Sequence, residues 1–222
     1  MKKKIIEIFK IPLKEKKARF DILIGGVLLM IPVVQFFSIG YLTKKLKKII
    51  ELEKNTIKWD ENLKELFIFG VKGTALLLIY LFIPFLFMFL GGFFISFLSK
   101  GKILSLFFFR GQILIITGTV LLLIIMFFFP AGICLYLEEN SIKKAVDFKS
   151  ILEKIILIPK EYGIVYFIIL GIYLFSIVLT FILFNWVIGI LSSGFIYFYD
   201  GFVSVHLIGK FFPRKSIKIP QK

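Results

Sequence analysis

Three long stretches of the chain contain only uncharged, mostly apolar residues, and they indicate the class of the protein. They run from residue 73 to 98, from 111 to 137 and from 162 to 184. Each exceeds the roughly 20 residues that an α-helix needs to cross about 30 Å of hydrocarbon. The pattern predicts an all-α integral membrane protein with these three stretches as spanning helices.

A fourth stretch, residues 186–209, is also mainly apolar but contains Asp200 and His206. It is long enough to span the bilayer, and we predict a fourth spanning helix here. An ionisable side chain inside a bilayer is costly and is therefore a candidate for function. Asp200 lies about 14 residues, or about 21 Å, into this helix. It faces the interior of the helix bundle, unless Gly201 breaks the helix and leaves Asp200 near the headgroups beside Lys210.

Residues 22–41 are ambiguous, because they are apolar but interrupted by Pro32 and Gln35. Proline removes a backbone donor and disfavours a helical residue before it, so two half-helices that meet near Pro32 are expected. The segment either enters the membrane and returns, covered by other parts of the protein, or crosses as one kinked span. In both cases the amide of Gln35 is expected to pair with carbonyls freed near Pro32.

The distribution of basic residues separates these two alternatives. Lys and Arg occur in five groups: eight before Phe20, eight at 44–72, three at 100–110, five at 143–160 and five from 210 onward. Short loops rich in Lys and Arg stay on the cytoplasmic side of a membrane. A crossing segment would place the first two groups on opposite sides, whereas a returning segment leaves only the group of three outside. The charges favour the return, with both termini cytoplasmic, and the kinked span stays open.

Two further segments, residues 42–72 and 138–161, combine lysines with apolar residues at helical spacing. They are predicted to lie as amphipathic helices in the headgroup plane, and Ser141 is placed to cap the second. Residues 1–21 and 210–222 are basic tails, so that the whole chain forms one membrane domain. Contacts with lipid headgroups are expected from Lys44, Lys45, Lys47, Lys48, Arg110, Lys143 and Lys144.

Composition supports this interpretation, because 59% of the 222 residues are hydrophobic and the net charge is +15. The N-terminus is basic but lacks the compact apolar stretch and cleavage site of a signal peptide, so we expect no cleavage and a plasma-type membrane. The lysines lie beside the spans, which makes anionic lipid a simpler partner than nucleic acid. A protein partner or a second copy of the chain stays open. The single cysteine, Cys134, is expected to be a packing residue.

The stretch GGVLLMIPVVQFFSIGYLTKKLKK, followed by WDENLKELFIFGVKG and IYLFIP, resembles the N-terminal signature of the domain-of-unknown-function family 4013. This family is an archaeal and bacterial group of multi-pass membrane proteins. The later sequences FPAGICLYLEENSIKKAVDFKSIL and FIYFYDGFVSVHLIGKFF are similar to the rest of the pattern, so the resemblance covers roughly residues 22–212. NTIKWD departs from the acidic or proline-containing turn that members usually have. The resemblance implies the architecture and no activity.

The sequence contains no nucleotide-binding loop, paired metal ligands, Ser-His-Asp set or CxxC motif. We expect no cofactor and no metal. Catalysis would need at least two convergent titratable groups, and only Asp200 and His206 lie at membrane depth, so no enzymatic activity is expected. The candidate polar membrane site comprises Asp200, His206, Gln35 and Asn185.

Two functions follow from these patterns. The first is a non-enzymatic structural or interaction protein whose broken segment and amphipathic helices shape or sense the inner leaflet. The alternative is a small transporter or channel subunit with a polar site near Asp200 and the broken helix at Pro32. A weak repeat favours the alternative, because proline-bearing apolar segments at Pro32 and Pro130 are each followed by a basic amphipathic segment, and transporters often contain internal repeats.

Overall fold

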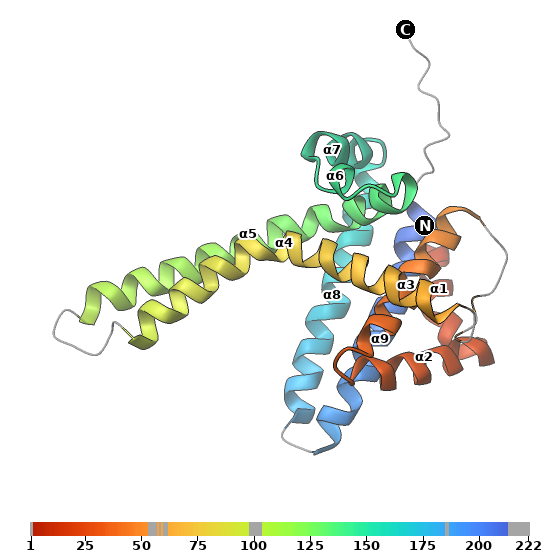
Figure 1. The fold of residues 1–222 in the computed structure, drawn as a ribbon, viewed down its shortest axis with the longest axis horizontal. Coiled ribbons are helices and arrows are strands. Elements are labelled where there is room, and N and C mark those ends of the chain that lie inside the picture. The colour runs from red at the N-terminus through yellow and green to blue at the C-terminus, as the bar shows by residue number, and fades with distance from the viewer. Residues whose placement is uncertain are drawn as a thin grey trace, which may run out of the picture.

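The computed structural model describes residues 2–52, 57, 59, 62–97, 104–184 and 187–212. Within these residues every regular element is an α-helix, as predicted (Figure 1). The helices are α1 (Lys2–Lys14), α2 (Lys16–Leu29), α3 (Gln35–Ile50), α4 (Leu63–Phe97), α5 (Leu104–Glu139), α6 (Ile142–Ala145), α7 (Phe148–Ile156), α8 (Pro159–Phe184) and α9 (Val187–Phe211).

The predicted break in residues 22–41 is a reversal of the chain between α2 and α3. Pro32 lies in the turn between the two helices, and Val33 beside it has a φ of 69°. The missing N–H of proline and the restriction on the residue before it explain why α2 ends here. The hydroxyl of Ser38 donates to the carbonyl of Gly25 at 2.8 Å, which ties α3 back to α2. A single kinked helix across residues 22–41 is therefore not formed.

The first two basic segments differ from their predicted form. Residues 1–21 were expected to be a tail, but α1 and the start of α2 occupy them. The predicted amphipathic helix at 42–72 is divided between the end of α3 and the start of α4. The two helices cross with their backbones in contact, because a Cβ at Gly40 would lie 1.8 Å from the carbonyl oxygen of Leu66. This part of the segment therefore packs against another helix, and the periodicity of the sequence does not reveal such packing.

The second amphipathic segment, residues 138–161, is also divided. It contains α6, α7 and the start of α8. The side chain of Ser141 accepts a hydrogen bond from the backbone N–H of Lys144, so the predicted cap is confirmed. The side chain of Asp147 caps α7 in the same way, because it accepts a hydrogen bond from the backbone N–H of Ser150. This cap allows the chain to turn between the two short helices.

α4 and α5 form a long hairpin, the arm, that projects from the remaining helices (Figure 1). Glycines allow the two helices to approach closely, because a Cβ at Gly91 would lie 2.7 Å from the carbonyl oxygen of Gly111. The outer faces of the arm are apolar and exposed, with Phe82 67%, Phe89 71% and Ile116 62% exposed. Such surfaces are compatible with contact to lipid.

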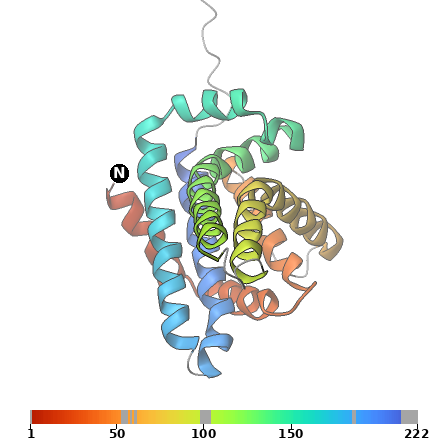
Figure 2. The ribbon, with the colours of Figure 1, turned by 90° about the vertical axis from the view of Figure 1, so that its left-hand side faces the viewer.

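Three helices are long and apolar enough to cross a membrane: Leu63–Ser96, Phe109–Glu139 and Pro159–Leu183. They correspond to the three predicted spans at 73–98, 111–137 and 162–184. The fourth predicted span, 186–209, corresponds to α9, which is not among the three and stays a prediction. The arm runs crosswise to α8 and α9 in both views (Figures 1 and 2). In this arrangement the arm and α8 do not both run along the normal of one flat bilayer.

α9 is the central helix of the body. It packs against α8 on one side and against α2, α3 and α1 on the other. Phe198, Phe202, Val203 and Leu207 are fully buried along it. A helix that is surrounded by protein in this way places its polar residues among other helices rather than in lipid, and Asp200 is one of them.

Candidate functional site

Asp200 lies in the interior of α9 and is only 2% exposed. The helix continues through Gly201, so the alternative in which Gly201 breaks the helix is wrong. Lys210 does not satisfy Asp200 either, because its Nζ lies 3.8 Å from a carboxylate oxygen of Glu7 on α1. The structure therefore places Asp200 inside the helix bundle, as the first alternative predicted.

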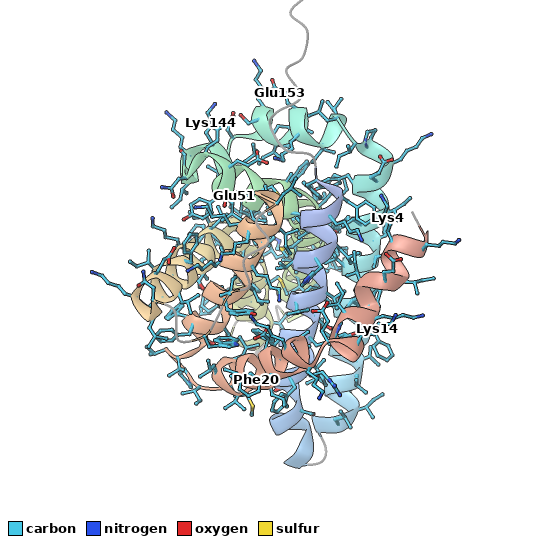
Figure 3. The ribbon with its side chains drawn as sticks, turned by 90° about the vertical axis from the view of Figure 1, so that its right-hand side faces the viewer. Lys4, Lys14, Phe20, Glu51, Lys144 and Glu153 are labelled. Carbon is cyan, nitrogen blue, oxygen red and sulfur yellow. The ribbon has the colours of Figure 1, made fainter. Side chains whose placement is uncertain are left out.

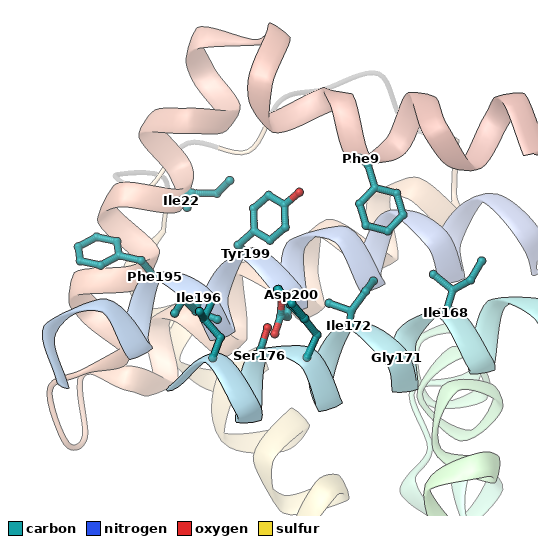
Figure 4. A pocket seen from close by; sticks show the side chains of 12 residues that line it. Phe9, Ile22, Ile168, Gly171, Ile172, Ser176, Phe195, Ile196, Tyr199 and Asp200 are labelled. Atoms are coloured by element: carbon teal, nitrogen blue, oxygen red, sulfur yellow. The ribbon is translucent and has the colours of Figure 1, made fainter. Parts of the chain in front are cut away.

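The carboxylate of Asp200 lies at the base of a groove between α8 and α9, the Asp200 groove. Its volume is about 760 Å³, and Phe9 of α1 and Ile22 of α2 border it (Figure 4). Ser176 of α8 is 3% exposed, and its hydroxyl faces the carboxylate. The other lining residues are mostly apolar: Ile168, Gly171, Ile172, Phe175, Leu179, Phe195, Ile196 and Tyr199.

The electrostatics of Asp200 are unusual for a buried carboxylate. Its Oδ2 atom is buried and has no hydrogen-bond partner among the described residues. The hydroxyl of Ser204, one turn further along α9, is also buried, and the hydroxyl of Tyr173 on α8 lies close to it. No ion pair to Asp200 occurs within the part of the chain that the structure describes. Buried charges are normally paired, which makes Asp200 a candidate binding residue.

The other members of the predicted polar membrane site are not brought to Asp200. The Nδ1 atom of His206 lies 2.8 Å from the carbonyl oxygen of Phe202, and the His206 ring lies against the Phe202 ring. Gln35 lies at the start of α3, where its backbone N–H donates to the carbonyl of Ile31. No side-chain bond of Gln35 to a freed carbonyl is seen among the described residues. Asn185 lies outside the described residues.

A second buried carboxylate, Asp21 on α2, was not singled out by the sequence. The hydroxyl of Tyr41 donates to its Oδ2 at 2.5 Å, and the indole Nε1–H of Trp59 donates to its Oδ1 at 3.1 Å. Nζ of Lys45 lies 3.8 Å from the same carboxylate. The rings of Tyr41 and Trp59 are stacked, with centroids 4.1 Å apart. We call Asp21, Tyr41, Lys45 and Trp59 the Asp21 cluster.

The Asp21 cluster connects α2, α3 and the segment before α4, and it is a structural latch in which both carboxylate oxygens are satisfied. Burial lowers the pKa of Lys45 to about 8, and the charge of Asp21 opposes this effect. The only sequence signal was an aspartate next to an apolar segment, which by itself is typical of a solvated helix end. The partners lie 20 and 38 residues away, so the pairing was not readable from the chain.

The predicted lipid-headgroup residues fall into two sets. Lys44 and Lys45 are turned inward, in contrast to the prediction. Lys44 pairs with Glu65 on α4 at 2.6 Å, and Lys45 lies beside Asp21 and 3.8 Å above the ring of Phe202. Both face inward because α3 packs against α4 and α9, which covers the face that carries them.

The remaining predicted residues are nearer the surface. Nζ of Lys47 is 4.0 Å from a carboxylate oxygen of Glu51, which follows the last residue of α3, and Lys48 is half-buried. Arg110 is exposed near the start of α5. Lys143 and Lys144 are exposed on α6, and Lys144 projects outward in Figure 3.

The described residues contain no group of three His, Cys, Asp or Glu side chains that could hold a metal ion. Cys134 is a free thiol buried in the apolar core, where α5 meets α4 and α8.

The model of a family described as protein of unknown function (DUF4013) matches residues 23–196. This match includes Tyr41, Lys45 and Trp59, but it begins after Asp21 and ends before Asp200. No curated protein and no solved structure matches the chain.

Proposed function

Because the chain belongs to the family of proteins of unknown function DUF4013, we propose a function from its own geometry: a non-enzymatic protein of the cell membrane that contacts anionic lipid headgroups. The proposed contact surface is the basic cap, residues 141–160, which contains α6, α7 and the start of α8. The observation that carries this proposal is the mixture of exposed lysines and exposed large apolar side chains on one short segment.

The basic cap exposes lysines at positions 143, 144, 149 and 160. Between them it exposes apolar side chains, among which Phe148 is 57%, Ile156 69% and Leu157 54% exposed. Exposure of these apolar side chains to water is energetically unfavourable. At a bilayer surface the apolar groups enter the headgroup region, and each lysine adds about 1 kcal/mol of attraction to an anionic leaflet.

The inner face of the basic cap is fixed to the rest of the protein. The hydroxyl of Tyr80 on α4 donates to the carbonyl of Ala145 at 2.5 Å. Lys154 on α7 forms a buried ion pair with Glu138 at the end of α5, with 2.5 Å between Nζ and Oε1. The cap is therefore held in one orientation, with Lys154 on its inner side and Lys144 projecting outward (Figure 3).

The test compares thermal unfolding of the full chain in nanodiscs of phosphatidylcholine with and without phosphatidylglycerol. Wild type should unfold at a higher temperature in the anionic discs, and changing Lys143, Lys144, Lys149 and Lys160 to Gln should remove most of that difference. A matched control changes Lys3, Lys4, Lys16 and Lys17, which are exposed on α1 and α2. The proposal fails if wild type unfolds at the same temperature in both kinds of disc, or if the control variant loses as much of the temperature difference as the cap variant.

The topology that accompanies this proposal has a returning α2–α3 hairpin and both termini in the cytoplasm. It is supported by the reversal at Pro32 and by the apolar side chains exposed along the hairpin, such as Val27 and Ile31. Single cysteines at Lys4 and Glu51, in a Cys134→Ala background, test it in intact cells. Labelling of both positions from the same side supports the hairpin, whereas labelling from opposite sides shows that the segment crosses.

A second candidate function is a small transporter or channel subunit, and the unpaired carboxylate of Asp200 favours it. Flux of a labelled organic cation into proteoliposomes should then be measurable with wild type and lost in Asp200→Asn. A parent protein that gives no flux, or a variant that retains it, removes this candidate.

A further inference from the structure

We propose that the Asp200 groove binds a lipophilic monovalent cation, an organic ammonium whose apolar body fills the groove and whose charged nitrogen meets the carboxylate of Asp200. The inference deepens the second candidate function by naming its substrate class. It concerns binding alone, so it can be tested whether or not the molecule is carried across a membrane.

The size and walls of the groove suit an organic molecule. A volume of about 760 Å³ falls within the roughly 300–1,000 Å³ that small-molecule sites occupy in proteins. The walls come from α8 and α9, and α1 and α2 border them through Phe9 and Ile22 (Figure 4). Gly171 on α8 leaves a gap in this wall, because a Cβ built there would meet no atom within 4 Å. An apolar body has room between the helices.

The polar groups of the groove select a positive charge. Asp200 Oδ2 has no hydrogen-bond partner within the described residues, and among the lining side chains drawn in Figure 4 the hydroxyl of Ser176 faces the carboxylate. A cation that pairs with this carboxylate relieves the cost of an uncompensated buried charge, whereas an anion would be repelled. Phe175, Phe195 and Tyr199 add aromatic rings whose faces attract organic cations.

A metal ion fits the groove poorly. Divalent cations such as Ca²⁺ and Mg²⁺ take about six or more oxygen ligands, and the described lining offers only Asp200, Ser176 and Tyr199 as oxygen-bearing side chains. The remaining lining is hydrocarbon, which binds the body of an organic molecule and not a hydrated ion. The combination of one carboxylate with an apolar wall therefore points to an amphiphilic cation.

The test measures equilibrium dialysis of two probes against the full chain in nanodiscs, with empty nanodiscs subtracted. The probes are 1-adamantylamine, which is cationic at neutral pH, and 1-adamantanol, which has the same cage and no charge. Wild type should bind the amine on the order of tenfold more tightly than the alcohol, because a hydrogen bond to a charged group is stronger than a neutral one.

Three variants separate charge from shape. Asp200→Asn should bind both probes with similar affinity, since the amide keeps the size of the side chain and loses the charge. Gly171→Leu should weaken binding of both probes by filling the groove, and it should fold because the position faces open space. Gly163→Leu is the matched control, since this glycine also lies on α8 with open space around it and does not line the groove. It should bind like wild type.

Several results would overturn the proposal. Equal binding of amine and alcohol by wild type would make the groove an apolar crevice for lipid tails. A preference for the amine that survives in Asp200→Asn would place the cation elsewhere, and so would unchanged binding in Gly171→Leu. Absence of binding of either probe would exclude the proposed ligand class. Loss of flux with binding intact would contradict only the transport candidate.

Discussion

Replacing Tyr41 by phenylalanine removes one hydroxyl from the centre of the Asp21 cluster and leaves the ring in place. In wild type this hydroxyl donates to Asp21 Oδ2 at 2.5 Å, and both residues are almost fully buried, at 1% and 2% exposure. The ring of Tyr41 stacks on Trp59, and this stack does not depend on the hydroxyl. The substitution therefore isolates one hydrogen bond to a buried carboxylate.

The expected loss follows from what remains beside Asp21. Trp59 still donates to Oδ1, but Oδ2 keeps only Nζ of Lys45 at 3.8 Å, which is too far for a strong hydrogen bond. A hydrogen bond to a charged group contributes about 1.5–3 kcal/mol, so Tyr41→Phe should lower the free energy of unfolding by about 2 kcal/mol. Little apolar area is lost, because the ring is retained.

The measurement is equilibrium denaturation of the purified chain in detergent micelles, followed by circular dichroism and by tryptophan fluorescence. Tyr197→Phe is the matched control, because the described residues show no hydrogen bond from its hydroxyl, and it should change the free energy by less than about 0.5 kcal/mol. A double-mutant cycle with Asp21→Asn should give a coupling energy of similar size to the single loss. A loss below about 0.5 kcal/mol for Tyr41→Phe, or an additive cycle, would refute the assignment of the latch.

Three further predictions use the same denaturation assay. Gly40→Ala should lower the free energy of unfolding by about 2 kcal/mol or more, because its Cβ would lie 1.8 Å from a carbonyl oxygen of α4. The control Gly163→Ala should raise the free energy of unfolding by up to about 1 kcal/mol, because open space surrounds this glycine. Equal effects of the two substitutions would contradict the close crossing of α3 and α4. Val33→Gly should raise the free energy of unfolding by about 1 kcal/mol by removing strain at φ 69°, and a loss would show that this strain is absent. Burial lowers the pKa of folded Lys45 to about 8 from 10.5, so the unfolded chain binds more protons than the folded chain above pH 8. The free energy of unfolding of wild type should therefore rise from pH 8 toward 10 more steeply than that of Lys45→Met. Parallel curves for the two proteins would contradict the burial of the charge. Near and above pH 10 the raised pKa of folded Tyr41 makes the free energy of unfolding fall as pH rises, so the comparison of the two curves ends there.

Local features of the fold were predictable because they depend on residues close together in the chain. The apolar stretches gave the positions of α4, α5 and α8, although each helix extends beyond the uncharged stretch, most clearly at the start of α4. Pro32 ends α2 through its own covalent structure, and Ser141 caps α6 through an amide three residues later. Such effects act within one or two helical turns.

Side-chain partners could not be predicted in the same way. Lys44 and Lys45 have the sequence context of headgroup ligands, yet Glu65 and Asp21 hold them inside the protein. Asp21 has the context of a solvated helix end, yet it is the centre of a buried cluster. Whether a lysine or aspartate faces lipid, water or another helix depends on which helix faces meet.

By itself, the sequence determined an all-α chain with three helices able to cross a membrane, a break at Pro32 and a basic segment beginning near Ser141. Only the tertiary structure decided that α9 is enclosed by α1, α2, α3 and α8 and that Asp200 lies unpaired at the base of a groove. The tertiary structure also decided that the arm runs crosswise to α8. The physical reason is that helix formation follows hydrogen bonds between residues four apart, whereas burial and pairing follow contacts between residues that the chain alone does not bring together.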